Sequence, residues 1–574
     1  MVVASPLRRR SLAQRRLIFL ALVALVSILG IVALLLLTGP PTEQQRAERF
    51  VAAWVRGDYT AMQSELTDAS RKARPLADFR KAYTDAAATA TITGLKAGPV
   101  DRPKDGIVVV PMTVTTRAFG VVRQPIRLPF RGDGDDARID WTQHLTFPGV
   151  RQGERLDRRM RLAPRASILA RDGTPLAQGS ERGSPLGAIA TAIAGKLDVP
   201  PPERLDELRA LGIPEDAKVG VTGLERVFDA ELAGRPGGTL LAGSRMLAIG
   251  TPKAAEAVRT TIDPDVQRSA VEALGNQFGG VAVLRPKSGE ILGLAGVAFS
   301  GLQPPGSTFK IMTLAGALEA RLAGAGSSYP VQTAATLEGV ELENAHGESC
   351  GGSLRLSFAH SCNSVFAPLG ARLGPERLVK IAEAFGFNQD LRIPGAATST
   401  IPPAREIGDE LAVGSSAIGQ GKVQATALQM AWVAATIAEG GVRTSLTLRA
   451  GRSPIRKRVV RASTARLVGR FMEAVVQVGT GRAAAIPGVR VAGKTGTAEL
   501  EDTSQPDCTP AEGVECPPVQ ADDPSDTTAW FAAYAPAGRP RVAVAVVLIA
   551  NGVGGETAAP LAREVLSAGL KATR

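Results

Sequence analysis

The sequence predicts an α+β protein of several domains with one transmembrane helix at its amino end. Three observations lead to this prediction. A basic tail at residues 1–16 precedes an apolar run at residues 17–37. Helix patterns are followed by strand patterns within residues 42–150. Apolar strand patterns also lie at both ends of residues 259–574 around a long helical middle, an arrangement typical of an antiparallel α+β domain.

The apolar run has the length of a membrane anchor. As a helix, its 21 residues cross a hydrocarbon layer of about 30 Å. Five arginines lie in the preceding tail, and positive flanks stay in the cytoplasm. A cleaved signal peptide, the alternative, has a shorter apolar region and a small-residue cleavage site, which the sequence after the run lacks. We therefore expect a single-pass cell-membrane protein with the rest of the chain outside the cytoplasm.

The net charge of +12 does not by itself indicate a nucleic-acid partner. Positive charge also suits an anionic lipid or wall surface. Aromatic residues make up only 4% of the chain, and they form no stripe with basic residues of the kind that single-strand binders use. We expect no nucleic-acid partner.

The segment 42–150 is predicted to fold as a small α+β domain. Apolar residues recur at helical spacing in residues 43–59, and a second helix is predicted at 76–88. Strands are predicted at 107–115 and 139–146, and in the second of these the apolar residues fall on one face.

The next segment, residues 151–257, is mixed and rich in proline, glycine and arginine. One strand in it is expected to end in a turn at Asp172-Gly173. After it, a helix is expected from Thr261-Ile262-Asp263 and a hairpin around Lys287-Ser288-Gly289. The hairpin strands, three late strands and the final helix are predicted at residues 280–284, 290–294, 491–497, 528–534, 542–550 and 561–570.

The first motif with chemical meaning is the pair Ser307 and Lys310, which follows a Pro-Pro-Gly turn. Side chains three residues apart share one face of a helix turn, so a neutral lysine there can accept the serine proton. The helix amino end favours developing negative charge. The alternative is a serine that caps a helix beside a surface lysine.

The second motif is Ser361 and Asn363, whose hydroxyl and carboxamide can reach the same cleft. A hydroxyl relays protons, and a carboxamide hydrogen-bonds a peptide. The alternative is an ordinary polar helix end.

The third motif is Lys494, Thr495, Gly496 and Thr497, which follows apolar residues and so lies in a strand. The lysine and the first threonine suit a carboxylate, and the glycine allows a substrate backbone to approach. The alternative is a strand-edge lysine and a bulge glycine.

Together, Ser-x-x-Lys, Ser-x-Asn and Lys-Thr-Gly in this order resemble the active-site set of penicillin-binding proteins and serine β-lactamases. Residues 417–421, 479–481 and 529–536 carry further marks of the family. The segment 42–150 resembles the NTF2-like domain of MecA-type members, and 151–257 resembles the pedestal (dimerisation) domain of class B members. The pedestal departs from the family at its first marker, which reads Pro-Arg-Ala and Ala-Arg-Asp-Gly instead of Pro-Arg-Gly and Asp-Arg-Asn-Gly.

The resemblance implies a transpeptidase domain at 259–574 with an antiparallel five-stranded sheet and a helical subdomain. It implies that Ser307 attacks the penultimate D-Ala carbonyl of a peptidoglycan stem peptide, with Lys310 as the base. Ser361, with Lys494, passes a proton to the leaving amine. No metal and no cofactor are expected.

Substrate binding follows from the same resemblance. Asn363 holds the donor peptide, and Thr495 and Thr497, beside Gly496, bind the terminal carboxylate or that of a β-lactam. The backbone N–H groups of Ser307 and Thr497 form the oxyanion hole. The expected partners are stem peptides, β-lactams, the cytoplasmic membrane, a glycosyltransferase and other wall-synthesis proteins.

Two other functions remain as alternatives. A D,D-carboxypeptidase or a β-lactamase shares the three motifs, although such enzymes are usually shorter and a β-lactamase needs a water-activating base that we do not identify. A non-catalytic scaffold for wall synthesis is the other alternative, and the intact motifs argue against it.

The four cysteines are expected to form two local disulfides, Cys350 with Cys362 and Cys508 with Cys516. Free thiols, or a zinc site with two nearby histidines, are the alternatives for the first pair. The second pair lies in residues 499–527, which hold nine acids and no lysine or arginine. This insertion is expected to be a solvated loop, and the alternative is that it controls access for the acceptor amine.

Overall fold

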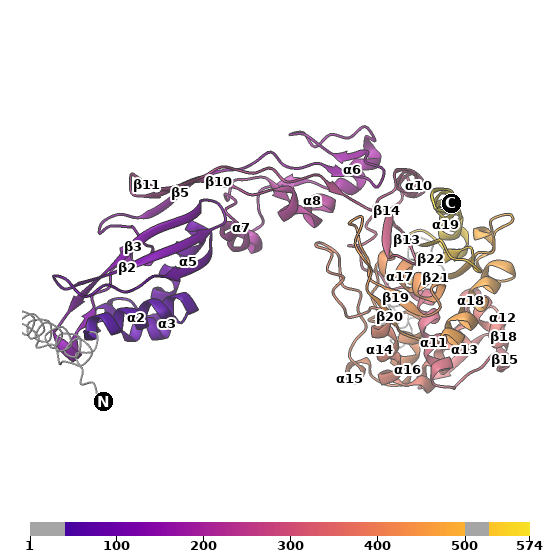
Figure 1. Ribbon diagram of the computed structural model, residues 1–574. Helices are drawn as coiled ribbons and strands as arrows, with labels where there is room; N and C mark the ends of the chain where they lie inside the picture. The colour runs from indigo at the N-terminus through magenta and orange to yellow at the C-terminus, as the bar shows by residue number, and fades with distance from the viewer. Residues whose placement is uncertain (1–40, 500–526, 574) are drawn as a thin grey trace, which may run out of the picture. The chain divides into compact units, whose positions relative to one another are not determined.

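The computed structural model describes residues 41–499 and 527–573 (Figure 1). The predicted tail, the anchor at 17–37, most of the acidic insertion and the Cys508–Cys516 pair lie outside the described residues. Within the described residues, no helix has both the length and the apolar character needed to cross a bilayer.

The chain folds into two compact units. The first contains the described chain up to Ala163 together with Pro201–Glu215 and Arg235–Lys253. The second contains Pro164–Pro200, Asp216–Gly234 and the chain from Ala254 onward. The segment 151–257 therefore contributes to both units.

The first unit begins with helices and continues into a sheet, as the sequence predicts. Its helices are α2 (Thr42–Arg56), α3 (Tyr59–Ser64), α4 (Asp68–Ala73) and α5 (Leu76–Ala90). Its main sheet has the order β1 (Ile92–Ala97), β2 (Ile107–Thr116), β3 (Gly120–Arg131) and β4 (Arg138–Ile139). Aromatic side chains of α2 and α5 fill the core between helices and sheet, with Trp54 and Phe79 both against Tyr83.

The strand predicted at 139–146 is wrong beyond its first residue. The strand β4 ends at Ile139, and Gln143–Thr146 form a 3-10 turn. After Ile139 the chain leaves the sheet, because Trp141 hydrogen-bonds residues of the helices α4 and α5. Its backbone N–H donates to Ser70 Oγ at 3.0 Å, and its indole Nε1 donates to Tyr83 Oη at 3.0 Å.

A second, three-stranded sheet completes the first unit. Its order is β11 (Arg245–Gly250), β10 (Gly237–Ala242) and β5 (Leu156–Arg161). The remaining helix of this unit is α7 (Leu205–Leu211).

The second unit starts with a small hairpin, β6 (Ile168–Leu169) and β7 (Pro175–Ala177), which turns at Asp172-Gly173 as predicted. The strand β12 (Val258–Arg259) pairs with β6. Beside them lie α6 (Ala188–Ala194), α8 (Gly223–Val227) and α9 (Asp229–Leu232). The buried Glu225 binds Arg165 and Arg182, each at 2.6 Å, and so joins these short elements.

The centre of the second unit is the predicted antiparallel sheet of five strands (Figure 1). Its order is β14 (Glu290–Gly296), β13 (Gly279–Arg285), β23 (Val542–Leu548), β22 (Thr527–Ala535) and β21 (Ala492–Glu499). Alternate residues face opposite layers, since Val281 packs with α10 (Pro264–Leu274) and α19 (Ala559–Ala572), whereas Ala282 packs with the helical subdomain. Both faces are therefore buried, and β21 is left as an edge strand.

The helical subdomain covers the other face of this sheet. Its main helices are α11 (Lys310–Glu319), α12 (Leu354–Ala359), α13 (Asn363–Leu373), α14 (Pro375–Ala384), α16 (Glu410–Ala417), α17 (Ala427–Ala438) and α18 (Ala462–Gln477). The helix α11 is buried from Lys310 to Leu318, which fixes the element that follows Ser307 in the interior.

Candidate active site

The three sequence motifs meet at one place in the second unit. Ser307 lies in the 3-10 turn η4 (Gly306–Phe309), Ser361 between α12 and α13, and Lys494 in the edge strand β21. Lys310 Nζ lies 2.9 Å from Ser307 Oγ, and Lys494 Nζ lies 2.8 Å from Ser361 Oγ. Lys310 Nζ and Ser361 Oγ are 3.4 Å apart, so the four side chains form an unbroken chain of polar contacts.

The predicted helix start at Ser307 is a 3-10 turn, and this explains how Ser307 reaches Lys310. In a 3-10 turn the side chains at positions i and i+3 eclipse each other. Ser307 and Lys310 have this spacing, and Lys310 directly follows the turn. The close approach of hydroxyl and amine therefore follows from local backbone geometry.

The surroundings of Lys310 favour its neutral form. The side chain is fully buried, and burial, followed by repulsion from Lys494, lowers the pKa of Lys310 well below its ordinary value. Its Nζ lies 2.6 Å from the Ser361 carbonyl oxygen and 2.6 Å from Asn363 Oδ1. Neither oxygen carries a hydrogen, so both accept from the amine. A neutral amine has two N–H groups, and its lone pair is then left for the Ser307 hydroxyl.

Lys494 is the second buried lysine. Its Nζ donates to Ser361 Oγ at 2.8 Å and to the Thr495 carbonyl oxygen at 3.0 Å. Burial lowers the pKa of Lys494 to about 7. Its Nζ also lies 5.6 Å from the ring centre of Phe358, and Lys310 Nζ lies 5.8 Å from the ring centre of Phe366. Lys494 can therefore gain or lose a proton near neutral pH.

Ser361 is held in a left-handed conformation, with φ of +63°. It follows the end of α12, where the Cys362 N–H donates to Ser357 O at 2.9 Å and the Ser361 N–H donates to Phe358 O at 3.2 Å. This pair of bonds is the Schellman motif, whose left-handed position is usually a glycine. A serine at that position costs roughly 1–3 kcal/mol, and it is kept where the surroundings fix it.

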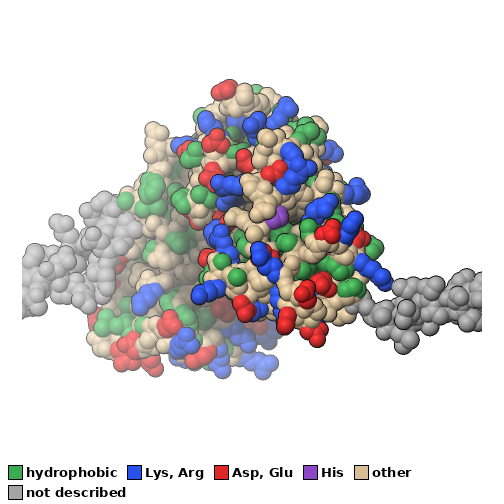
Figure 2. All heavy atoms as spheres, turned by 90° about the vertical axis from the view of Figure 1, so that its left-hand side faces the viewer, with side chains coloured by type: hydrophobic (Ala, Val, Ile, Leu, Met, Phe, Trp, Pro, Cys, Tyr) green, Lys and Arg blue, Asp and Glu red, His purple; other side chains and the backbone are tan. Residues whose placement is uncertain are grey.

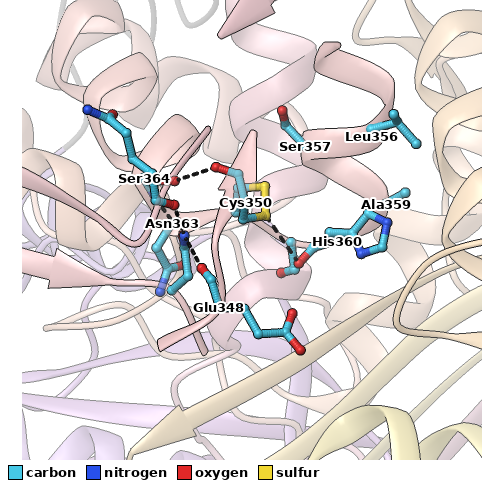
Figure 3. Close-up of a disulfide and its surroundings, with 12 residues drawn as sticks. Glu348, Cys350, Leu356, Ser357, Ala359, His360, Asn363 and Ser364 are labelled. Atoms are coloured by element: carbon cyan, nitrogen blue, oxygen red, sulfur yellow. Dashed lines mark hydrogen bonds between the residues drawn. A yellow bond between two sulfur atoms is a disulfide. The ribbon is translucent and has the colours of Figure 1, made fainter. Parts of the chain in front are cut away.

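A disulfide between Cys350 and Cys362 holds the residue next to Ser361 (Figure 3). It joins the strand β18 (Cys350–Ser353) to the start of α13, with a Cα–Cα distance of 5.5 Å. The predicted disulfide is confirmed, and the zinc and free-thiol alternatives fall away for this pair. Among residues 41–499 and 527–573, no group of three His, Cys, Asp or Glu side chains could hold a metal ion.

Asn363 and Asn344 tie the same segment to a neighbouring hairpin, β16 (Ala334–Leu337) and β17 (Val340–Glu343). Asn363 Nδ2 donates to the Glu343 carbonyl oxygen at 2.7 Å. The buried Asn344 accepts from the Ser364 N–H at 2.9 Å, and its Nδ2 donates to the Glu348 carbonyl oxygen, also at 2.9 Å. Asn363 therefore positions Lys310, a role that the sequence did not indicate, and Asn344 was not singled out at all.

The predicted carboxylate-binding threonines lie on β21 beside this chain. Thr495 Oγ1 is 2.6 Å from Thr480 Oγ1, and Thr497 Oγ1 accepts from the Gly554 N–H at 3.4 Å. A Cβ on Gly496 would lie 2.8 Å from Pro305 O, so glycine is needed for contact between β21 and η4. This packing is a second reason for glycine at this position, beside the substrate approach that the sequence predicts.

The surface on the face in Figure 2 carries basic and acidic side chains that intermingle, without a continuous basic stripe among the described residues.

Two family matches cover most of the described chain. Residues 279–567 match the penicillin binding protein transpeptidase domain, and residues 42–154 match the NTF2-like N-terminal transpeptidase domain. The first match alone spans half of the chain and contains all three motifs. The chain belongs to the penicillin-binding protein family.

Its relatives include peptidoglycan D,D-transpeptidase PbpA of Mycolicibacterium smegmatis, which is 33% identical over 61% of this chain and 80% of the relative. PbpA of Mycobacterium tuberculosis is 33% identical over 55% of this chain and 72% of the relative. The crystal structure of PBPA from M. tuberculosis superposes with a TM-score of 0.55 at 27% identity and covers 71% of this chain and 99% of that chain. Its imipenem acyl-enzyme complex matches with the same coverage, a TM-score of 0.55 and 26% identity.

Removal of the disulfide is expected to slow acylation of Ser307 about tenfold, because small displacements of catalytic groups cost rate. The change is Cys350→Ser together with Cys362→Ser. The melting temperature should also fall, since closing a loop of this length stabilises a fold by about 3 kcal/mol in the chain-entropy account. Penicillin adduct formation, followed by intact mass, measures the rate. A reductant should slow acylation of the wild type and leave the acylation rate of the double variant unchanged. Equal acylation rates in all samples would contradict the disulfide's role.

The second-order rate constant of acylation is expected to be bell-shaped in pH. It should rise with pH as Lys310 loses its proton and becomes a base, and fall as Lys494 loses its positive charge at about 7. Penicillin adduct formation measured over a pH series gives the profile. In Lys494→Arg, which stays protonated, the descending limb should move to higher pH. A wild-type profile without a descending limb would contradict the assignment for Lys494.

Proposed function

We propose that this protein is a peptidoglycan D,D-transpeptidase that crosslinks stem peptides through an acyl-enzyme on Ser307 and binds β-lactams covalently at the same residue. The observation that carries this proposal is the unbroken polar chain from Ser307 through Lys310 and Ser361 to Lys494. It supplies a nucleophile, a base and a proton path in one site. The relatives named as D,D-transpeptidases and the neighbour solved as a β-lactam acyl-enzyme support the same reaction.

Acylation begins when Lys310 accepts the proton of Ser307 and the serine oxygen attacks the penultimate D-Ala carbonyl of a stem peptide. A C–O bond forms, and the carbonyl oxygen becomes an oxyanion. We assign its stabilisation to the backbone N–H groups of Ser307 and Thr497. Gly306 next to Ser307 approaches Thr497 closely enough that a Cβ there would meet the Thr497 carbonyl, so the two backbones are neighbours.

The leaving group then needs a proton. We assign its delivery to Ser361, which lies between the two lysine amines and can pass a proton from either of them to the D-Ala nitrogen. The C–N bond breaks and D-Ala departs. An acceptor amine from a second stem attacks the ester, loses its proton back to the same chain and regenerates Ser307.

Donor recognition is assigned to the edge strand β21 and to Asn363. Thr495 and Thr497 bind the terminal carboxylate, and a protonated Lys494 adds positive charge. An edge strand leaves backbone groups unpaired, so an extended peptide can add to β21 as a further strand.

We also infer that the protein works at the outer face of the cytoplasmic membrane with a glycosyltransferase partner. The apolar run at 17–37 behind its basic tail supports the anchor. The partner is inferred from chemistry, because a crosslinking enzyme acts on glycan strands that a polymerase has already made.

Hydrolysis is the second candidate function. In the described part of the chain, no carboxylate is hydrogen-bonded to Ser307, Lys310, Ser361 or Lys494, whose contacts are with one another, with Asn363 and with backbone oxygens. A carboxylate beside the nucleophile would be the natural base for a deacylating water. Its lack here favours a long-lived acyl-enzyme over β-lactamase activity.

The test is intact-mass analysis of the purified protein after incubation with penicillin, with Ser307→Ala as the control. We expect a stable adduct on the wild type and none on the variant. Penicillin consumed without an adduct would make the protein a hydrolase. Penicillin left intact without an adduct would favour a non-catalytic scaffold.

A further inference from the structure

Two threonine hydroxyls from different elements face each other beside the site. Thr495 belongs to β21, and Thr480 lies between α18 and the short turn at Arg482–Ala484. Their Oγ1 atoms are 2.6 Å apart. Thr495 is only 5% exposed, whereas Thr480 is exposed and so lies at the rim of the site. The proposed mechanism gives Thr480 no role.

The backbone around Thr480 is fixed from two sides. Its N–H donates to the Ala359 carbonyl oxygen at 3.1 Å, at the end of the helix that leads to Ser361. A Cβ on Gly479 would meet the same oxygen, and a Cβ on Gly555 would lie 2.5 Å from the Thr480 carbonyl oxygen. Contacts this close need glycine at both positions, so close packing holds the Thr480 backbone beside β21.

The Thr480 hydroxyl has two possible acceptors within hydrogen-bond distance. Thr480 Oγ1 is 3.4 Å from the Ala359 carbonyl oxygen, which already accepts from the Thr480 N–H, and only 2.6 Å from Thr495 Oγ1. In the short contact either hydroxyl can be the donor, and the Thr480 hydroxyl is close enough to donate to Thr495. When Thr480 is the donor, Thr495 directs its own O–H elsewhere, and a hydroxyl that accepts one hydrogen bond becomes a stronger donor of the next.

Thr497 has the same arrangement. Its oxygen accepts from the Gly554 N–H at 3.4 Å, so its O–H can point toward an anion. With Thr480 as the donor, both hydroxyls on β21 receive a hydrogen bond from a neighbouring segment and have hydrogens to offer to an anion.

We propose that Thr480 is a positioning residue that makes the site selective for acyl donors with a free terminal carboxylate. It does so by holding the Thr495 hydroxyl as a donor. This inference rests on the proposed function and extends it to donor specificity. Without the Thr480 hydroxyl, Thr495 could turn its O–H toward another acceptor, and the carboxylate would lose one charge-assisted hydrogen bond.

The test compares two thioester acyl donors on the full-length protein: an N-acyl-D-alanyl thioglycolate, which carries a carboxylate, and its methyl ester. The variant is Thr480→Val, which keeps the shape and removes the hydroxyl, and Thr480→Ser is the matched control. We expect Thr480→Val to acylate about tenfold more slowly with the carboxylate donor, with the methyl ester rate unchanged. Thr480→Ser should restore the wild-type preference.

An equal loss with both donors would mean a structural role, and no loss with either would mean no role; both results overturn the inference. These outcomes differ from failure of the proposed function, in which the wild type itself would be acylated by neither donor nor by penicillin.

Discussion

The contact between a buried lysine amine and the Ser307 hydroxyl is the interaction on which the rest of the site depends. Serine is a weak nucleophile unless a base takes its proton, and lysine is a base only when neutral. Burial in α11 and the neighbouring Lys494 supply that condition. The two oxygens that accept from Lys310 come from the Ser-x-Asn segment, so the second motif orients the first.

Most of the supporting architecture serves to hold that segment. A serine in a left-handed helix end is strained, and it is secured by a disulfide on the adjacent residue and by the amides of Asn344 and Asn363. On the opposite side, glycines at positions 479, 496 and 555 bring three backbones together, which leaves the threonines of β21 at fixed positions. The fold thus places three distant pieces of sequence at hydrogen-bond distance by close backbone packing around a sheet that is buried on both faces.

Much of this could be predicted from the sequence, and the failures have physical causes. The strands at both ends of residues 259–574 follow from hydrophobic periodicity, and the Ser307–Lys310 pair follows from three-residue spacing. The five-stranded sheet was implied by the family resemblance. The prediction of a strand at 139–146 was wrong because Trp141 binds Ser70 and Tyr83, and both of these residues lie far from it in the sequence. The contact of Gly496 with Pro305 O is a tertiary distance that a sequence pattern does not show. Asn344 and the role of Thr480 depend on tertiary distances alone.

The most direct test of the account is the protonation state of Lys310 in the resting enzyme. Lysine-selective 15N labelling of the full-length protein, with NMR detection of side-chain nitrogens across a pH series, separates neutral amines from ammonium groups. A neutral amine signal is expected below pH 7, where Lys494 keeps its proton, and this signal should disappear in Lys310→Met and persist in Lys494→Met. A Lys310 that remains an ammonium group at the pH of maximal acylation would contradict its assignment as the base.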